Sequence, residues 1–269
     1  MLLLCFGFGV TPLKVSIWLF AGSTVSLADL FMNGVFRLYT YHPFLLPNPD
    51  KDNHLGVMIA EMLFVPASYS LMAYLPRHLR FWYTLLITLL VTSLEVLFLR
   101  IRVYEHDGWR ILYTVILFAV YGTVVSTWAN RFDGQGYTRL NRAVQLATSL
   151  FFPAAVWGLG MDSIVEVVAT RPGWLVNPDR DLILGGYLLE GIPVIVVGLV
   201  ACIYRWNRRP WQLVVMAGVL TVWFCFLRWW GVTVAHPRWN LALEALVWTL
   251  LIWGVGRLDR WFERETRNR

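Results

Sequence analysis

The chain has 269 residues, of which 58% are hydrophobic and 15% charged, with a mean hydropathy of +0.56. A soluble domain usually has about 25% charged residues, so this composition argues against an ordinary soluble protein. The net charge of +6 is assigned to loops that face anionic lipid, not to nucleic-acid binding. The three cysteines form no CxxC pair, which argues against a disulfide framework.

Apolar runs of about 20 residues recur along the chain, separated by short polar stretches, and this pattern is typical of transmembrane helices. We predict an all-α polytopic membrane protein with eight spans, at residues 12–36, 54–75, 81–101, 110–129, 142–168, 182–204, 211–234 and 239–257. The first ten residues lack the basic start and the A-x-A site of a signal peptide. They are interpreted as the approach to the first span.

Lysine and arginine are more numerous in the loops on the side that holds both chain ends than in the loops on the other side. The positive-inside rule therefore predicts a multi-pass protein of the cell membrane with both termini cytoplasmic.

One stretch of the chain occurs twice, 129 residues apart (from 48 to 177, for example). The first copy is Asn48-Pro49-Asp50-Lys51-Asp52, then Leu55-Gly56 and Glu61; the second is Asn177-Pro178-Asp179-Arg180-Asp181, then Leu184-Gly185 and Glu190. In each copy a polar loop containing proline leads into an apolar segment with one glutamate. Coincidence is the alternative, but the likeness extends further and favours an internal duplication.

The likeness continues on both sides of this stretch. Asp29 precedes the first copy and Asp162 the second, with spacings of 19 and 15 residues; downstream, Arg100 matches Arg228 and His106 matches His236. Each half then holds four spans, and an even number returns the chain to its starting side, which predicts two parallel four-helix repeats. We expect a first repeat at 1–130, a linker at 131–141, a second repeat at 142–258 and a charged cytoplasmic tail at 259–269.

Seven carboxylates fall within or at the edge of the predicted spans: Asp29, Glu61, Glu95, Asp162, Glu166, Glu190 and Glu244. A charge at the centre of a membrane helix costs about 2.5–3.5 kcal/mol, so each should face the bundle interior. In such surroundings the neutral acid is favoured, which makes it a proton donor. The matched pair Glu61 and Glu190 is expected to converge between the halves. The alternative for each acid is a structural role, bonded to a neighbouring side chain.

The acidic pairs of the two loops admit two interpretations. Asp50 with Asp52, and Asp179 with Asp181, have oxygens of the kind that magnesium prefers. Asn-Pro followed by Asp also suits a turn that starts a helix, with Asp52 or Asp181 as the N-cap. We favour capping and predict no metal site. The chain has no GxGxxG after a strand, no P-loop, no HExxH and no GxSxG, so we predict no cofactor.

These residues together resemble the repeated domain of the small integral-membrane lycopene cyclases, which occur as heterodimers or tandem fusions. The second half resembles it through Asp162, Trp174, Asn177-Pro178, Gly185 and Glu190, and the first half through Asp29, Asn48-Pro49, Gly56 and Glu61. The family typically has Pro-x-Glu-Glu, where this chain has Ile59-Ala60-Glu61-Met62 and Leu188-Leu189-Glu190-Gly191. The layout is similar, more distantly, to the membrane meroterpenoid cyclases.

The resemblance implies an isomerase-class terpene cyclase that needs no cofactor and acts on a lipophilic isoprenoid substrate among membrane lipids. A neutral carboxylic acid would protonate the polyprenyl chain, aromatic faces would stabilise the cation, and a second carboxylate or water would remove a proton. By matching, Glu61 and Glu190 are the first catalytic candidates. Asp29 and Asp162 would orient them, and Glu95 would be an extra acid or base.

Two other functions are compatible with buried acids in repeated bundles. A proton-coupled transporter of small solutes needs a polar path to the bilayer midplane, whereas the spans here contain few Ser, Thr, Asn and Gln between the acids. A non-catalytic scaffold would use the acids only to join helices, and would lack a pocket of a few hundred Å³.

Overall fold

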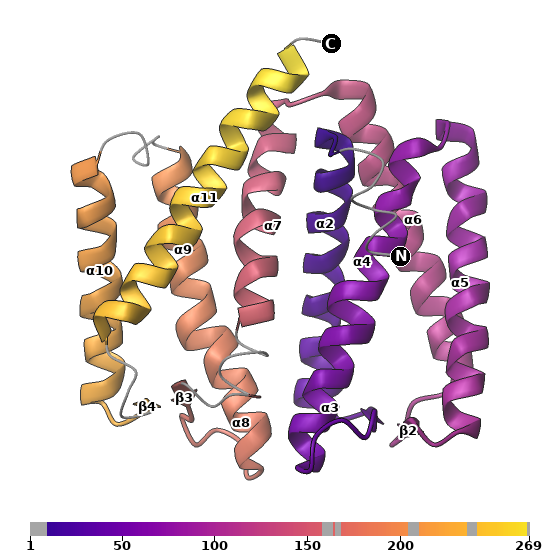
Figure 1. Cartoon of the computed structure of the whole chain (residues 1–269), viewed down its shortest axis with the longest axis horizontal. Helices are drawn as coiled ribbons and strands as arrows, with labels where there is room; N and C mark the ends of the chain where they lie inside the picture. The colour runs from indigo at the N-terminus through magenta and orange to yellow at the C-terminus, as the bar shows by residue number, and fades with distance from the viewer. Residues whose placement is uncertain (1–9, 158–163, 165–167, 204–209, 236–240, 268–269) are drawn as a thin grey trace. The chain divides into compact units, whose positions relative to one another are not determined.

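The computed structural model of the whole chain describes residues 10–157, 164, 168–203, 210–235 and 241–267. The chain is mostly helical (Figure 1). Its internal contacts divide it into two compact units, residues 1–141 (unit 1) and residues 142–269 (unit 2). Of the predicted acids, Asp162 and Glu166 lie outside the described residues.

Unit 1 begins with α2 (Pro12–Asp29), which continues as the π-helix η1 (Leu30–Val35). A second continuous helical run consists of α3 (Pro49–Val57), the π-helix η2 (Met58–Phe64), α4 (Val65–Ser70) and the 3₁₀ turn η3 (Leu71–Tyr74). Helices α5 (Arg77–Arg100) and α6 (Ile111–Gln135) complete the unit. Thr11 caps α2 through its side chain and Asn48 caps α3, and in both helices proline follows at the first position, where its missing N–H has no cost.

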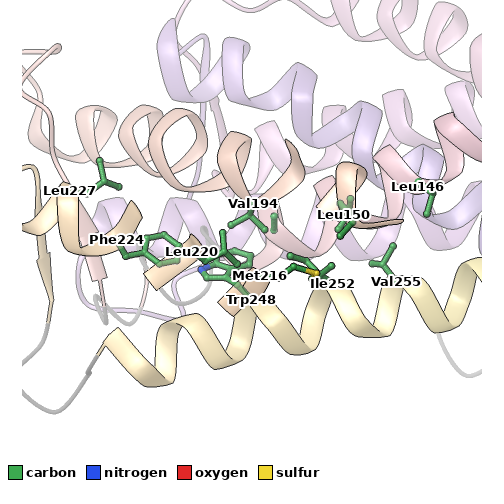
Figure 2. Close-up of a cluster of buried hydrophobic side chains, with 12 residues drawn as sticks. Leu146, Leu150, Val194, Met216, Leu220, Phe224, Leu227, Trp248, Ile252 and Val255 are labelled. Carbon is green, nitrogen blue, oxygen red and sulfur yellow. The ribbon is translucent and has the colours of Figure 1, made fainter. Parts of the chain in front are cut away.

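Unit 2 contains α8 (Pro178–Gly185), the π-helix η5 (Gly186–Gly191), α9 (Ile192–Ile203), α10 (Pro210–Trp229) and α11 (Leu241–Arg267), after α7 (Arg139–Trp157), which starts at the unit boundary. Figure 2 shows its core, in which buried apolar side chains of α7, α9, α10 and α11 meet, among them Leu150, Val194, Leu220, Phe224 and Ile252. Burial of such side chains is the main stabilising contribution.

Helix covers a described part of each of the eight predicted segments. Five of these segments are long and apolar enough to cross a membrane, namely Pro12–Val35, Pro49–Tyr74, Arg77–Arg100, Ile111–Gln135 and Asp181–Ala201, and Val214–Trp229 is a shorter apolar helix. These helices indicate a membrane protein. Within the expected charged tail at 259–269, α11 continues through Arg267 and Phe262 is buried, and the carboxylate of Asp259 lies 2.8 Å from the guanidinium of Arg142.

Two short antiparallel strand pairs, each formed by segments far apart in the sequence, accompany the helices, and the all-α prediction missed both. In unit 1, β1 (Tyr39–Tyr41) pairs with β2 (Tyr104–His106), with Tyr39 opposite His106. In unit 2, β3 (Val168–Thr170) pairs with β4 (Thr233–Ala235), with Val168 opposite Ala235. Each residue of the second strand pair lies 129 positions after the residue at the same place in the first.

This register corrects two of the residue matches made from the sequence. The position equivalent to His106 is Ala235, not His236. Likewise Arg228 corresponds to Leu99 rather than Arg100, because the backbone bond from Gly231 to Arg228 repeats the one from Arg102 to Leu99.

The Asn-Pro-Asp loops share a second local arrangement. The carboxylate of Asp52 accepts from the backbone N–H groups of Phe44, Leu45 and Leu46 at 2.8–2.9 Å, and Asp181 accepts from Gly173, Trp174 and Leu175 at 2.6–3.0 Å. The prediction that Asp52 is the N-cap is wrong, because Asn48 caps the helix and Asp52 instead anchors the loop that precedes it. Within the described residues, no group of three or more His, Cys, Asp or Glu side chains is placed to hold a metal.

The backbone of both halves also turns in the same way at two pairs of positions, one after the first strand and one before the second strand of each unit. Phe44 and Arg102 have φ values of +57° and +58°, and the residues 129 positions later are Gly173 and Gly231, with φ of +77° and +75°. Glycine adopts this left-handed conformation without steric cost. The same turn is therefore formed by glycine in unit 2 and under strain in unit 1.

Candidate functional site

Unit 1 contains a pocket of about 850 Å³, a figure that includes its open mouth. Its wall is mostly apolar and strongly aromatic, with the aromatic members Tyr39, Tyr41, Phe64, Phe98, Tyr104, Trp109, Phe118 and Tyr121. Two carboxyl groups line it, Glu61 from η2 and Glu95 from α5. A concave apolar chamber with a few polar groups is the usual form of a small-molecule site.

Glu61 is held by two tyrosines of β1. Its Oε1 lies 3.0 Å from Tyr39 Oη and 3.1 Å from Tyr41 Oη, while Oε2 is buried without a hydrogen-bond partner. The residue belongs to a π-helical segment, a local widening of the helix that is frequent at functional sites. The π-helical segment η2 and the strand β1 together fix the carboxyl at the pocket wall.

Asp29 lies on the other side of Tyr39. The tyrosine Oη is 2.5 Å from Asp29 Oδ1 as well as 3.0 Å from Glu61 Oε1. The hydroxyl of Tyr39 has one proton, so it can donate a hydrogen bond to only one of the two carboxyls. Its contact with the other carboxyl is favourable when that carboxyl is protonated and donates to the tyrosine oxygen. Two like charges this close in a medium of low dielectric repel. The geometry therefore favours one proton held between the two acids.

The hydroxyl groups of this cluster remain proton donors. Tyr39 and Tyr41 lie in β1, outside the candidate spans. Burial, reinforced by the nearby carboxyls, raises the pKa of both hydroxyls well above the usual value for tyrosine. The rings pack on Tyr104, at centroid distances of 5.5 and 4.8 Å, and Trp109 meets Tyr39 edge-on at 5.6 Å.

The glycine of the repeated stretch, Gly56 or Gly185, explains how a strand comes so close to the helix in each unit. A Cβ on Gly56 would lie 2.4 Å from Tyr41 Cβ, and one on Gly185 would lie 2.3 Å from the carbonyl oxygen of Thr170. In both units the strand crosses the helix at a point where only glycine fits. Gly56 and Gly185 are thus required for the contact between strand and helix. This contact places Tyr41 beside Glu61 in unit 1 and Thr170 beside Glu190 in unit 2.

Glu95 occupies another part of the same pocket. Its Oε1 lies 2.8 Å from His106 Nε2, and its Oε2 is buried without a hydrogen-bond partner. The His106 ring meets Tyr104 edge-on at 5.3 Å. His106 lies between the predicted spans 81–101 and 110–129, and its contact with Glu95 was not predicted, because no periodicity links a histidine after a turn to a glutamate within the preceding helix.

Unit 2 keeps the frame but not the polar set. Glu190 lies on η5 and accepts a hydrogen bond from Thr170, whose Oγ1 is 3.0 Å from Thr233 Oγ1. The register places these threonines where unit 1 has Tyr41 and Tyr104. Glu190 lines a smaller pocket of about 340 Å³, a figure that again includes the open mouth, together with Phe151, Ala154, Ala155, Gly186, Tyr187, Gly191, Ile195 and Trp248.

The second acid of unit 1 has no acidic counterpart in unit 2. The residue 129 positions after Glu95 is Phe224, which is fully buried in the apolar core. Glu244 is instead paired with Arg228 at 2.9 Å. The asymmetry between the halves therefore concerns the residues with chemical functions, while the frame is common.

The structure thus brings three of the five candidate acids together in unit 1: Asp29 and Glu61 share a tyrosine, and Glu95 lines the same pocket. Glu190 lies among residues of its own unit, and Asp162 is not among the described residues. Comparison of the chain with protein-family models, with curated proteins and with solved structures gave no match.

Proposed function

We propose that this chain is an integral-membrane cyclase that closes a ring in a lipophilic polyprenyl substrate by protonation, without a cofactor. The observation that carries the proposal is the unit 1 pocket, in which Glu61, joined through Tyr39 to the buried Asp29, lines an apolar, aromatic chamber. A proton-coupled transporter needs a polar passage for its solute. The apolar wall favours a substrate of isoprenoid type.

In the proposed reaction Glu61 is the acid. Its O–H bond breaks and a C–H bond forms with the electron pair of the terminal alkene, which leaves a cation on the neighbouring carbon. The next alkene then attacks this cation and closes the ring. Tyr39 and Tyr41 donate hydrogen bonds to the carboxylate that forms, and charge-assisted hydrogen bonds of this kind are about twice as strong as neutral ones. After the product leaves, a proton from water restores the acid form of Glu61.

The wall of the pocket protects the cation. An aromatic face stabilises a nearby cation by about 0.5–2 kcal/mol, and Tyr104 and Trp109 lie in this wall. Apolar lining also excludes water, which would otherwise trap the cation as an alcohol. Both effects support a pocket suited to a carbocation.

The proposal includes the duplication. We infer two parallel four-helix repeats of which unit 1 retains the reacting groups and unit 2, with Glu190 and threonines, has a supporting or substrate-positioning role. With both termini in the cytoplasm, the two strand pairs would lie on the outer side of the membrane.

The test is substitution of the proposed acid. Glu61→Gln and Glu190→Gln variants are reconstituted in lipid nanodiscs and supplied with geranylgeraniol, squalene or lycopene, and cyclised products are measured by mass spectrometry. General acid catalysis contributes about 10²–10⁴-fold, so we expect Glu61→Gln to lose at least 100-fold, and Glu190→Gln to lose less. A matched control is Glu105→Gln, an exposed acid on β2 whose partner is His42. Full activity of Glu61→Gln would refute the assignment.

A further inference from the structure

The proposed cyclisation releases a proton as well as consuming one, and the pocket has a second carboxyl that the protonation step does not use. Glu95 lines the pocket and is 6% exposed, and its Oε2 is buried with no hydrogen-bond partner. An unpaired acceptor at a buried site is costly, so its retention calls for a role. The cation itself must lose a proton to end the reaction.

His106 connects this carboxyl to the outside. Its Nε2 lies 2.8 Å from Glu95 Oε1, and its side chain is 19% exposed, against 6% for that of Glu95. The residue belongs to β2, which follows the C-terminal end of α5 and lies outside the candidate spans. Histidine is the side chain best suited to pass protons near neutral pH. The pair therefore extends from the pocket wall to a side chain that reaches solvent.

The chain supplies its own comparison for this pair. In unit 2 the position of Glu95 is taken by Phe224 and that of His106 by Ala235, although the two strands pair in the same register. The frame therefore forms without the acid and without the imidazole. A purely structural need for the pair would apply equally in both units.

We propose that Glu95 and His106 form the proton-accepting end of the unit 1 pocket. This inference rests on the proposed function. In the final step a C–H bond beside the cationic carbon breaks, its electron pair forms a C=C bond, and the proton goes to Glu95 Oε2. The carboxyl then gives this proton to water through His106. The substrate gains one proton at Glu61 and loses one at Glu95, so the overall reaction is an isomerisation. Glu95 is the catalytic residue and His106 a positioning and relay residue.

The experiment uses the full chain in nanodiscs with whichever of the three substrates above wild type cyclises. Glu95→Gln keeps the shape of the side chain and removes the base, and we expect at least 100-fold slower product formation. His106→Ala reproduces the residue that unit 2 has at this position, and we expect a loss of about 10-fold that added imidazole restores. Glu95→Asp, with its carboxyl withdrawn by one methylene, should retain more activity than Glu95→Gln. Glu105→Gln, on the same strand but directed to His42, is the control.

The outcomes separate the two proposals. Absence of cyclised product from wild type overturns both. If wild type is active and Glu61→Gln is not, while Glu95→Gln and Glu95→Asp form the same products at the wild-type rate, the cyclase stands and the accepting role of Glu95 falls. If His106→Ala remains folded by size-exclusion chromatography and loses activity that imidazole does not restore, the relay role of His106 is overturned. Restoration by imidazole supports it, because a merely structural defect would not respond to a soluble base.

Discussion

Replacing Gly56 by alanine tests how the site is assembled, because it places a methyl group between α3 and β1. The added Cβ would lie 2.4 Å from Tyr41 Cβ and 3.0 Å from Tyr41 Cγ. Carbon atoms that are not bonded to one another do not approach so closely. The strand must therefore move away from the helix, and the Tyr41 hydroxyl moves away from Glu61 with it.

Two opposing effects determine the size of the change. Overpacking costs about 1–3 kcal/mol, and the upper part of this range applies because the obstacle is the root of a side chain on a paired strand. Alanine is favoured over glycine within a helix by about 1 kcal/mol. We expect a net destabilisation of about 1–2 kcal/mol, which lowers the ratio of folded to unfolded protein by about 5–30-fold.

The free energy of unfolding is measured by titrating mixed micelles with sodium dodecyl sulfate. The control is Gly218→Ala in α10, where no heavy atom lies within 4 Å of the added Cβ, so only the helix effect remains and stability should rise or stay unchanged. In the cyclisation assay, Gly56→Ala should lose activity and Gly218→Ala should not. Unchanged stability and activity of Gly56→Ala would show that the position of β1 does not depend on this close contact.

Three further predictions concern the strand β1 and the loops that Asp52 and Asp181 anchor. Tyr41→Phe removes one of the two donors to Glu61, and we expect it to destabilise the fold by about 1 kcal/mol and to slow cyclisation by about 10-fold, measured in the same two assays; equal rates would contradict the role given to this hydroxyl. Asp52→Ala and Asp181→Ala each remove the acceptor of three backbone N–H groups, so each should lower the unfolding free energy by about 2–3 kcal/mol, and the two losses should be similar; a loss confined to one variant would count against the shared loop structure. Because burial raises the pKa of the Tyr39 and Tyr41 hydroxyls in the folded state, the stability they contribute is complete below pH about 10, the unfolded value, and decreases as the pH rises above it, by about 1.4 kcal/mol per pH unit for each tyrosine. Unfolding titrations between pH 9 and 11 should show this slope, smaller by one tyrosine in Tyr41→Phe, and a flat profile would contradict the burial of these groups.

The helices could be predicted from the sequence because burial in lipid or protein leaves long apolar runs that short polar stretches interrupt. The repeated stretch likewise indicated that Glu61 and Glu190 have equivalent positions within their helical segments. The strand pairs could not be predicted, since the three residues of each strand are too few for an alternating pattern. Their equivalence is also hidden in the sequence, where Phe44 and Gly173 look unrelated although their backbones share a left-handed turn.

The candidate site was predictable only in part. Asp29, Glu61 and Glu95 attract attention as charges in apolar segments, and all three belong to the unit 1 site. Their partners Tyr39 and His106 are placed beside them by the pairing of β1 with β2. The path of the chain into β2 depends on a turn at Arg102 with positive φ. Non-local pairing of this kind leaves no periodic trace in the sequence.

The π-helical segment η2 has a consequence for how the chain tolerates insertions and deletions. A π turn holds one residue more than an α turn, so residues after it are rotated about the axis by about 100° relative to an uninterrupted α-helix. Deleting one residue between 58 and 64 would restore regular α-helix and leave an apolar segment long enough to span the bilayer. The face that carries Gly56 and the face of α4 beyond it would nevertheless no longer be aligned as they are now. Changes of length within η2 should therefore do more harm than most substitutions there.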